Sequence, residues 1–315
     1  MSGRLAAFAA LGATLTFALA CSTVSAPNML RLGPVDVLVF APHPDDEVIG
    51  AAGVIQQAVA AGKRVRIVFA TNGDGYPDAA AALFNKPAAE LAHSDYLSLA
   101  ATRQREAIAA DKLLGVSASS LVFLGYPDAA LATVYADVSG PPVQSMFTGR
   151  SSTYGAAQAD FHTLAHGSAA SYTRLSALSD IEEILRESQP AQVYVTDCAD
   201  QHPDHSATYD LVRDAANATG FAGTLRTYLV HSGAGLEWPW PVGVTPQTAF
   251  ESHVVGGITY PLGMPWPPPV RVPITSAQSA VKLQALAAHK SQWDLPLERA
   301  FLESFVKSEE IFWTE

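Results

Sequence analysis

The 315-residue sequence predicts a single α/β domain, with a mostly parallel sheet covered by helices on both faces. Short apolar runs rich in β-branched residues alternate along the chain with segments in which Ala and Leu recur at helical spacing. This alternation is typical of parallel sheets, because a crossover helix usually joins two neighbouring parallel strands. The chain is also long enough to bury a large core. We therefore assign residues 34–315 to one domain.

Five strands and five helices are expected in strict alternation. The strands are predicted at residues 35–41, 65–70, 121–124, 192–196 and 225–230, and the helices at residues 46–61, 95–114, 179–187, 206–218 and 276–292. Gly62 and Gly115 stand directly after the first two helices, where glycine commonly ends a helix.

Two long segments interrupt this alternation. Residues 136–171 are rich in Gly, Ser, Thr and Ala, and residues 233–273 are dense in Pro, Gly and Trp. Loops of this length are uncommon inside a compact domain and often line functional sites. The alternative for the second segment is a proline-stiffened surface flap whose aromatic residues are structural.

The N-terminus, residues 1–26, is predicted to be an export signal and the start of a linker. Arg4 precedes residues 5–20, which are uncharged and too few to span a bilayer comfortably. Cys21 follows Ala20 in a pattern that resembles a bacterial lipobox, so a lipid anchor at Cys21 is expected to be the only membrane contact. Free export to the periplasm or medium, after cleavage behind Ala20 or Ala26, is the alternative.

Charge and cysteine content exclude several classes of protein. The formal net charge of −11 and the absence of a Lys/Arg block disfavour nucleic-acid binding. Cys21 and Cys198 are the only cysteines, so no disulfide framework is expected. Cys198 is interpreted as a small loop residue rather than a metal ligand. Neither a Gly-x-Ser-x-Gly elbow nor a phosphate-binding glycine loop is present.

A His-Pro-Asp triplet occurs twice, each time at or just beyond a predicted strand: in His43-Pro44-Asp45-Asp46-Glu47 and in His202-Pro203-Asp204-His205. Ligands of open α/β sheets bind beyond the carboxyl ends of the strands, so both triplets should meet in one crevice. Imidazoles and a carboxylate suit a divalent metal, with zinc the first choice. Three protein ligands would leave a coordination position open for water, as in catalytic zinc sites. Helix-capping aspartates and surface histidines would be the alternative for a single triplet.

The two triplets resemble the signature of the PIG-L/LmbE-like zinc-dependent de-N-acetylases. The resemblance covers residues 35–293 and includes three supporting motifs: Arg103-Gln104-Arg105-Glu106, Leu124-Gly125-Tyr126-Pro127-Asp128 and His289-Lys290-Ser291-Gln292. It implies a Rossmann-like α/β fold with long active-site loops. It also implies a zinc-dependent N-deacetylase acting on an N-acetylglucosamine-type sugar or glycoconjugate, which for an exported chain would lie outside the cytoplasm.

The resemblance further implies roles for individual residues. The zinc ligands would be His43, Asp46 and His205. Asp45 would be the general base that activates water for attack on the acetamide carbonyl. His202, oriented by Asp204, would stabilise the tetrahedral intermediate or protonate the leaving amine.

Substrate contacts are expected from residues outside the triplets. The resemblance places Arg103 on the sugar, supported by Glu106, with an i,i+3 surface ion pair as the alternative. His231 ends a predicted strand on the side of the site. Trp238, Trp240 and Trp266 are expected either to stack on sugar rings or to pack their loop onto the domain. Three further histidines are expected to be solvated: His93, His162 and His166.

Two other functions remain open at this stage. One is a metal-dependent hydrolase of another amide or ester, and the other is a non-catalytic carbohydrate- or metal-binding lipoprotein. Asp45 disfavours the second, because a binding protein needs no base. Within the family, members acting on mycothiol precursors place a tyrosine two positions before the second triplet. Asp200 stands there instead, and a mycothiol substrate is not expected.

Overall fold

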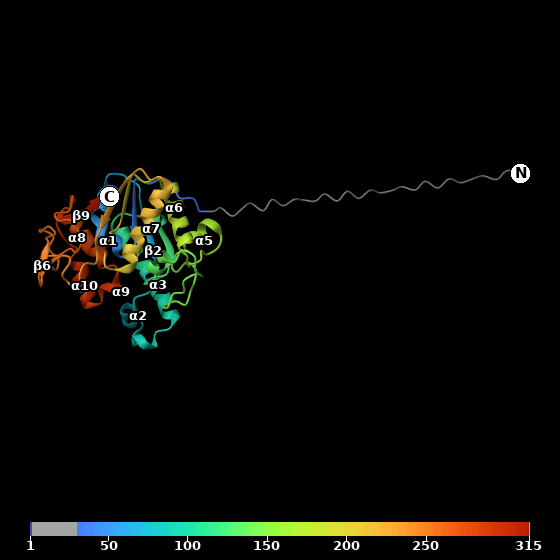
Figure 1. The fold of residues 1–315 in the computed structure, drawn as a ribbon, viewed down its shortest axis with the longest axis horizontal. Helices are drawn as coiled ribbons and strands as arrows, with labels where there is room; N and C mark the ends of the chain where they lie inside the picture. Colours follow the sequence, from blue (N-terminus) through green and yellow to red (C-terminus); the bar gives the residue numbers. More distant parts are fainter. Residues whose placement is uncertain (2–29, 315) are drawn as a thin grey trace.

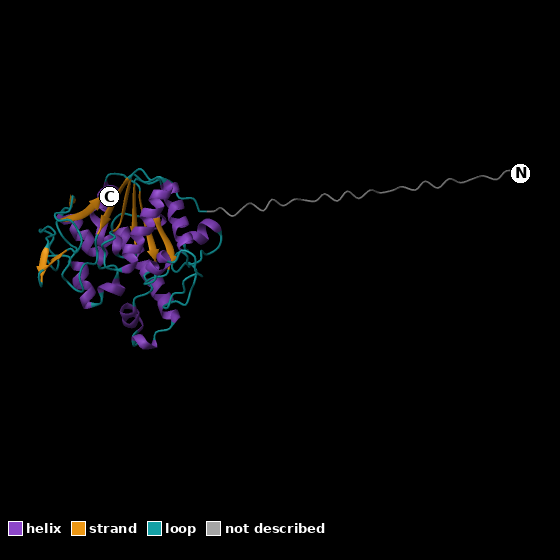
Figure 2. Ribbon diagram, viewed as in Figure 1, coloured by secondary structure: helices purple, strands orange, loops and turns teal. Residues whose placement is uncertain are grey.

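A seven-stranded sheet forms the centre of the molecule (Figures 1 and 2). The computed structural model describes Met1 and residues 30–314, so the predicted lipid attachment at Cys21 and the body of the export signal lie outside the described residues. Within the described part of the chain, no helix combines the length and apolar character needed to cross a bilayer.

The strand order confirms the predicted mostly parallel sheet. The order is β3-β2-β1-β4-β5-β9-β8, in which β1 to β5 are parallel and β9 runs antiparallel to both of its neighbours. The strands are β1 (Val37–Ala41), β2 (Val65–Thr71), β3 (Leu121–Tyr126), β4 (Gln192–Thr196), β5 (Thr224–Tyr228), β8 (Val270–Pro273) and β9 (Glu309–Thr314). A separate hairpin consists of β6 (His253–Val255) and β7 (Ile258–Tyr260).

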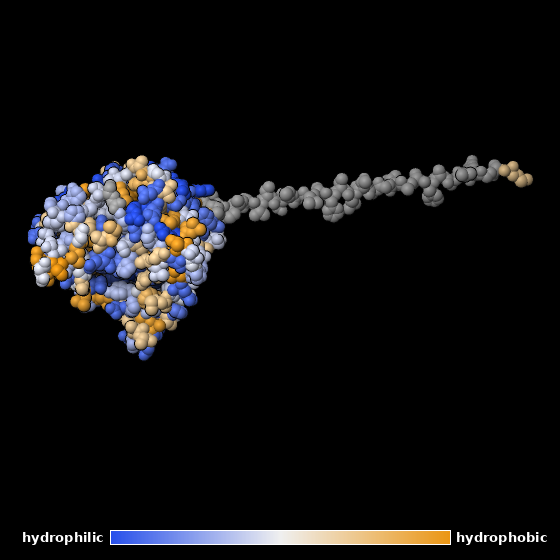
Figure 3. All heavy atoms as spheres, viewed as in Figure 1, coloured by the Kyte–Doolittle hydropathy of each residue, from blue (hydrophilic) through white to orange (hydrophobic). Residues whose placement is uncertain are grey.

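Helices cover both faces of the sheet, as predicted. In β1, Val37 and Val39 face one apolar core, while Leu38 and Phe40 face the other, because successive side chains of a strand alternate. The first core includes α1 (Asp46–Ala60), α3 (His93–Leu113) and α8 (Ser276–Leu286). The second includes α4 (Leu131–Ala136), α5 (Phe161–His166), α6 (Arg174–Ser188) and α7 (Pro203–Thr219). On the face drawn in Figure 3, hydrophobic residues form small groups between hydrophilic ones.

Three predicted elements differ from the structure. The predicted helix 276–292 is broken: α8 ends at Leu286 and the short α9 (Lys290–Trp293) follows, because His289 has a non-helical ψ of 63° and is fully buried. Helix α6 begins five residues earlier than expected, where Thr173 accepts the Ser176 N–H at its N-terminus. Helix α7 begins at Pro203, within the second triplet itself.

The two long segments contain more regular structure than the sequence predicts. Residues 136–171 include α5 and an isolated bridge between Ser152 and Ser171. Residues 233–273 include the β6–β7 hairpin and all of β8. Two more helices lie at the carboxyl side of the sheet: α2 (Pro77–Phe84) and α10 (Pro296–Glu303). Residues of α10, and Tyr76 just before α2, line the pocket described next.

Candidate metal centre and active site

The strand order brings the two triplets together. Strand β1 pairs with β2 on one side and with β4 on the other. The strands that follow β1 in the chain are therefore added first on the β2 side and then, from β4 onward, on the opposite side. Such a switch point opens a crevice beyond the carboxyl ends of the strands. His43 follows β1 and His202 follows β4, so both lie at this crevice.

A pocket of about 250 Å³ occupies the crevice. Its walls come from the two triplets and the start of α1, from the turns after β2, β3 and β5, from α3, and from the C-terminal helices. The charged and titratable residues that line it are His43, Asp45, Asp46, Tyr76, Arg103, Asp128, His202, His231 and Glu298.

Three side chains place potential metal-ligand atoms at the corners of a small triangle. His43 Nδ1 lies 3.1 Å from His205 Nε2, and both nitrogens lie 3.2 Å from Asp46 Oδ2. A tetrahedral zinc ion with bonds of about 2.0–2.2 Å holds its ligand atoms about 3.3–3.6 Å apart. The triangle therefore fits one divalent cation after very small adjustments, and all three residues are buried.

The outer nitrogens of the two imidazoles face carboxylates. His43 Nε2 lies 3.2 Å from Asp128 Oδ1 and 3.4 Å from Asp204 Oδ2. His205 Nδ1 lies 3.2 Å from Asp200 Oδ2. Metal-binding histidines usually have this arrangement, because a carboxylate that takes the outer N–H leaves the inner lone pair for the metal. His43, Asp46 and His205 thus fit the predicted ligand set.

Asp45 is held in an unusual conformation at the edge of the triangle. Its φ of 142° lies in a region that residues other than glycine rarely adopt. Its backbone N–H donates to Glu47 Oε2 (3.0 Å), and its carboxylate accepts from Arg103 Nη2 (3.0 Å). Burial raises the pKa of Asp45 to about 7, against the opposing charge of Arg103. A cation beside it would favour the charged form and lower this pKa.

His202 occupies the N-cap of α7. Its Nδ1 accepts the backbone N–H of Asp204 (3.2 Å), so in the neutral ring the proton is on Nε2. Burial and the charges of His43 and His205 lower the pKa of His202 to about 3, so the ring is neutral at pH 7. The other ring nitrogen of His202, Nε2, carries the proton and can donate a hydrogen bond to a ligand.

The role expected for the Asp204 side chain needs correction. Its carboxylate accepts the backbone N–H groups of Ala129 (2.6 Å) and Leu131 (2.9 Å) and does not contact the His202 ring. Asp204 orients His202 through its backbone N–H instead. The carboxylate fixes the turn after β3 and faces His43.

Arg103 lines the pocket, but it forms no direct hydrogen bond or ion pair with Glu106. The Arg103 guanidinium is buried and donates to the carbonyl oxygens of Gly73 and Pro44 as well as to Asp45. Glu106 instead accepts from the N–H and hydroxyl groups of Ser291 on α9. The alternative of a surface ion pair is therefore wrong, because Arg103 is buried and no salt bridge joins the two side chains. Glu106 supports Arg103 only through the attraction between their charges, which raises the pKa of Arg103 against the effect of burial. Arg103 positions Asp45, and Glu106 fastens α9 to α3.

His231 lies at the site, as expected. Its ring centre is 4.8 Å from that of His205, and it stacks on Phe301 of α10 at 5.3 Å with an interplanar angle of 7°. Burial and the charge of His205 lower the pKa of His231 to about 4. His231 and Phe301 thus form a flat aromatic wall of the pocket.

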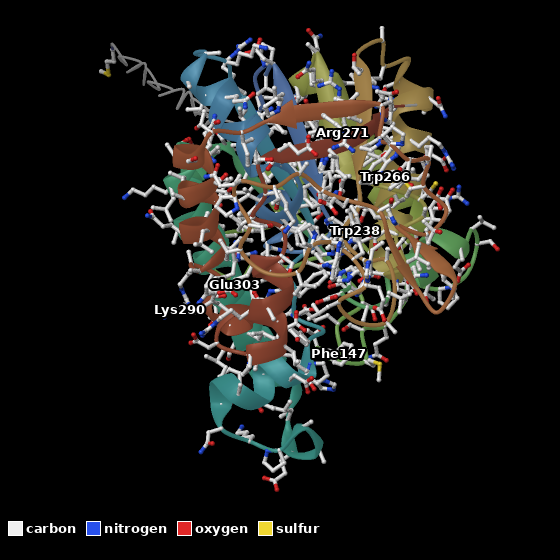
Figure 4. The ribbon with its side chains drawn as sticks, turned by 90° about the vertical axis from the view of Figure 1, so that its left-hand side faces the viewer. Phe147, Trp238, Trp266, Arg271, Lys290 and Glu303 are labelled. Atoms are coloured by element: carbon white, nitrogen blue, oxygen red, sulfur yellow. The ribbon has the colours of Figure 1, made fainter. Side chains whose placement is uncertain are left out.

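Trp238 and Trp240 are not part of the pocket wall. The Trp238 side chain is 1% exposed, donates its indole N–H to Leu229 O (3.3 Å), and packs against Phe250 and Trp266. Figure 4 shows Trp238 and Trp266 together within the body of the domain. Trp240 stacks on His253 at 3.8 Å. The expectation that Trp238 contacts substrate is wrong, because its side chain is buried in a packed loop. Trp240 is partly exposed but lies outside the pocket wall.

We expect Trp238→Ala to lower the free energy of unfolding by about 3–5 kcal/mol, the usual cost of removing a large buried aromatic side chain. Metal content at 20 °C or below should stay unchanged, because Trp238 contacts none of the metal ligands. Chemical denaturation measures the first quantity and elemental analysis the second. Trp240→Ala is the control and should cost much less, since Trp240 is partly exposed. Equal costs for both variants would contradict this assignment.

Several site residues were not predicted individually. Asp128 and Asp200 follow β3 and β4, so the argument used for the triplets could have found both. Phe301 and Glu298 come from α10, where no pattern in the sequence points to a pocket. Cys198 lies near the site but does not line the pocket; its sulfur is 3.6 Å from Asp197 Oδ1.

The fold and the site define an α/β protein with a candidate metal centre of two histidines and an aspartate at its switch point. The chain belongs to the PIG-L family, whose model, described as GlcNAc-PI de-N-acetylase, matches residues 38–216. The match extends from β1 to the end of α7 and contains both triplets. No curated protein sequence matches the chain significantly.

Solved structures share the fold at low sequence identity. The N,N'-diacetylchitobiose deacetylase from Pyrococcus horikoshii is 21% identical, with 89% of this chain and 83% of that chain covered and a TM-score of 0.52. The A40926 pseudoaglycone deacetylase is 19% identical, with 89% and 96% covered and a TM-score of 0.50. The 4-carboxy-2-hydroxymuconate hydratase from Pseudomonas putida KT2440 is 18% identical, with 86% and 82% covered and a TM-score of 0.50. At these identities the likeness establishes the Rossmann-like α/β fold alone.

Proposed function

We propose that this protein is a zinc-dependent hydrolase that removes the N-acetyl group from an N-acetylglucosamine-type sugar or glycoconjugate. The observation that carries the proposal is the ligand triangle of His43, Asp46 and His205 with Asp45 beside it in the same pocket. Membership of a family described as GlcNAc-PI de-N-acetylase supports the reaction type and the sugar class.

In the proposed reaction, Asp45 and His202 act on different atoms of the substrate and water. A zinc ion at the triangle would supply Lewis-acid polarisation of the amide carbonyl and lower the pKa of a water molecule. Asp45 takes a proton from the attacking water, whose oxygen bonds to the carbonyl carbon. His202 donates its Nε2–H to the carbonyl oxygen as negative charge develops there. The C–N bond then breaks, Asp45 returns the proton to the amine, and acetate and the free amino sugar leave.

Arg103 serves this reaction by holding Asp45. It donates to the Asp45 carboxylate and to the carbonyl oxygen of Pro44, so the base and the turn that carries it are fixed together. The positive charge of Arg103 favours the charged form of Asp45, which is the form that accepts a proton. A non-catalytic binding protein would not need this support of a buried carboxylate, so the binding alternative is disfavoured.

The remaining alternative is a metal-dependent hydrolase acting on another amide or on an ester. A panel should contain N-acetylglucosamine glycosides, chitobiose, N-acetyl amino acids and O-acetylated sugars. We expect acetate release from the N-acetylated sugars, with the other groups at least about tenfold slower in kcat/KM. Preference for O-acetyl esters or N-acetyl amino acids would favour the alternative and contradict the sugar assignment.

We also propose that the protein works outside the cytoplasm, attached to the membrane through a lipid on Cys21. The uncharged stretch at residues 5–20 and the position of Cys21 after Ala20 support this. Labelled palmitate should be incorporated when the full-length chain is expressed in a bacterium, and Cys21→Ser should abolish the label. Cys198→Ser is the control and should keep it. An unlabelled mature protein beginning at Pro27 would indicate free export instead.

A further inference from the structure

A second cluster of potential metal ligands lies between α5 and α6, away from the pocket. His162 and His166 stand four residues apart on α5, and Asp180 and Glu183 stand three apart on α6. Residues at these spacings share one face of a helix. None of the four residues lines the catalytic pocket. Figure 1 shows α5 and α6 on the opposite side of the domain from α8 and β9.

Each imidazole of this cluster faces one carboxylate. His162 Nδ1 lies 2.6 Å from Asp180 Oδ1, and His166 Nε2 lies 2.9 Å from Glu183 Oε2. The two imidazole rings are 4.4 Å apart between centres. One ligand atom from each of His162, His166 and Asp180 can be chosen so that all three lie within 4.8 Å of one another. Small rotations of these side chains would bring the ligand atoms to the spacing of tetrahedral zinc ligands, about 3.3–3.6 Å.

One side of the cluster is buried and held by a further hydrogen bond, and the other side is open to solvent. The Asp180 side chain is 1% exposed, and its second oxygen accepts the Tyr126 hydroxyl at 2.7 Å. Metal-binding carboxylates are commonly oriented by such a second hydrogen bond. The side chains of His162 and His166 are 22% and 39% exposed, so an ion can enter from that side. The expectation that these histidines are solvated thus holds for the exposed His166 and only in part for His162, and each ring also faces a carboxylate.

We propose that His162, His166, Asp180 and Glu183 form a second binding site for a divalent transition metal, with zinc as the probe. Imidazole and carboxylate together suit zinc, nickel and copper rather than magnesium or calcium. Two carboxylates and two neutral imidazoles carry a charge of about −2, which one divalent ion neutralises. A metal here would cross-link α5, and with it the long segment between α4 and α6, to the face of α6.

Metal stoichiometry tests this site. The purified protein is stripped with a chelator, titrated with Zn²⁺ and analysed by calorimetry and elemental analysis. The wild-type chain should bind two equivalents, and the double variant His162→Gln/His166→Gln should bind one. Deacetylase activity of that variant should stay within about twofold of the wild type, because neither histidine lines the pocket. The single variant His166→Gln, at the more exposed position, gives the same comparison with the least risk to folding.

Two further variants separate this site from the catalytic one. His93→Gln, at an exposed histidine outside both clusters, should keep two equivalents. His205→Gln should keep the second site and lose the catalytic one, so it should bind one equivalent. Unchanged zinc stoichiometry in the double variant would overturn the proposal. If instead the wild type bound one equivalent and the double variant none, the second site would stand and the catalytic metal site would fall.

Discussion

His43→Ala is expected to lose the catalytic metal and at least about 10³-fold in kcat/KM, because a bound metal contributes several kcal/mol to the stabilisation of developing charge. His43 supplies one corner of the ligand triangle, and its removal leaves one imidazole and one carboxylate. The same loss should follow chelation of the wild-type protein, and added Zn²⁺ should restore it. Steady-state kinetics with parallel metal analysis measures both effects.

The control for this prediction is His231→Ala. His231 lies at the same pocket, with its ring against Phe301, but contributes no atom to the triangle. We expect it to retain metal and to raise KM. Undiminished turnover by thoroughly metal-free protein would contradict the metal-dependent mechanism, as would full metal content in His43→Ala.

Asp45→Asn is expected to keep the metal and to lower kcat by about 10²–10⁴, the usual contribution of general acid–base catalysis. The amide has nearly the volume of the carboxylate and can still accept from Arg103, so the pocket should keep its shape. KM should change little, because the substitution removes a proton acceptor rather than a binding contact. Single-turnover and steady-state kinetics separate these quantities.

The matched comparison is Asp46→Asn, the same chemical change at the neighbouring position. Asp46 Oδ2 lies 3.2 Å from both histidine nitrogens of the triangle, and the charges and hydrogen bonds of His205 and His43 hold its pKa well below the usual value despite burial. This variant should weaken metal binding, and excess Zn²⁺ should rescue part of its activity. Metal loss in Asp45→Asn with retention in Asp46→Asn would reverse the two assignments.

The meeting of the two triplets could be predicted because it depends on local signals and one topological rule. Each triplet follows a β-rich run, and parallel strands end at the same edge of a sheet. This reasoning brings His43 and His205 together although 162 residues separate them. It cannot specify which strands are neighbours, and the pairing of β1 with β4 is what closes the triangle.

The predictions that differ from the structure concern residues whose contacts lie far away in sequence, because no periodicity in the sequence indicates such contacts. Glu106 binds Ser291, 185 residues away, so the local i,i+3 spacing to Arg103 was misleading. Trp238 is buried because the loop after β5 folds back onto the sheet, which a Pro- and Trp-rich composition does not reveal. The break before α9 likewise depends on the tertiary burial of His289, since helical periodicity continues through it.

The most direct test of the account is the release of acetate and free amine from N-acetylglucosamine glycosides, measured against the amount of zinc bound. The account predicts acetate and amine in equal amounts. The rate should be zero in metal-free protein and rise in proportion to occupancy of the site formed by His43, Asp46 and His205. The double variant His162→Gln/His166→Gln, in which the proposed second site is removed, makes this proportionality simple to measure. Absence of acetate from the fully zinc-loaded variant with every N-acetylated sugar tested would contradict the account.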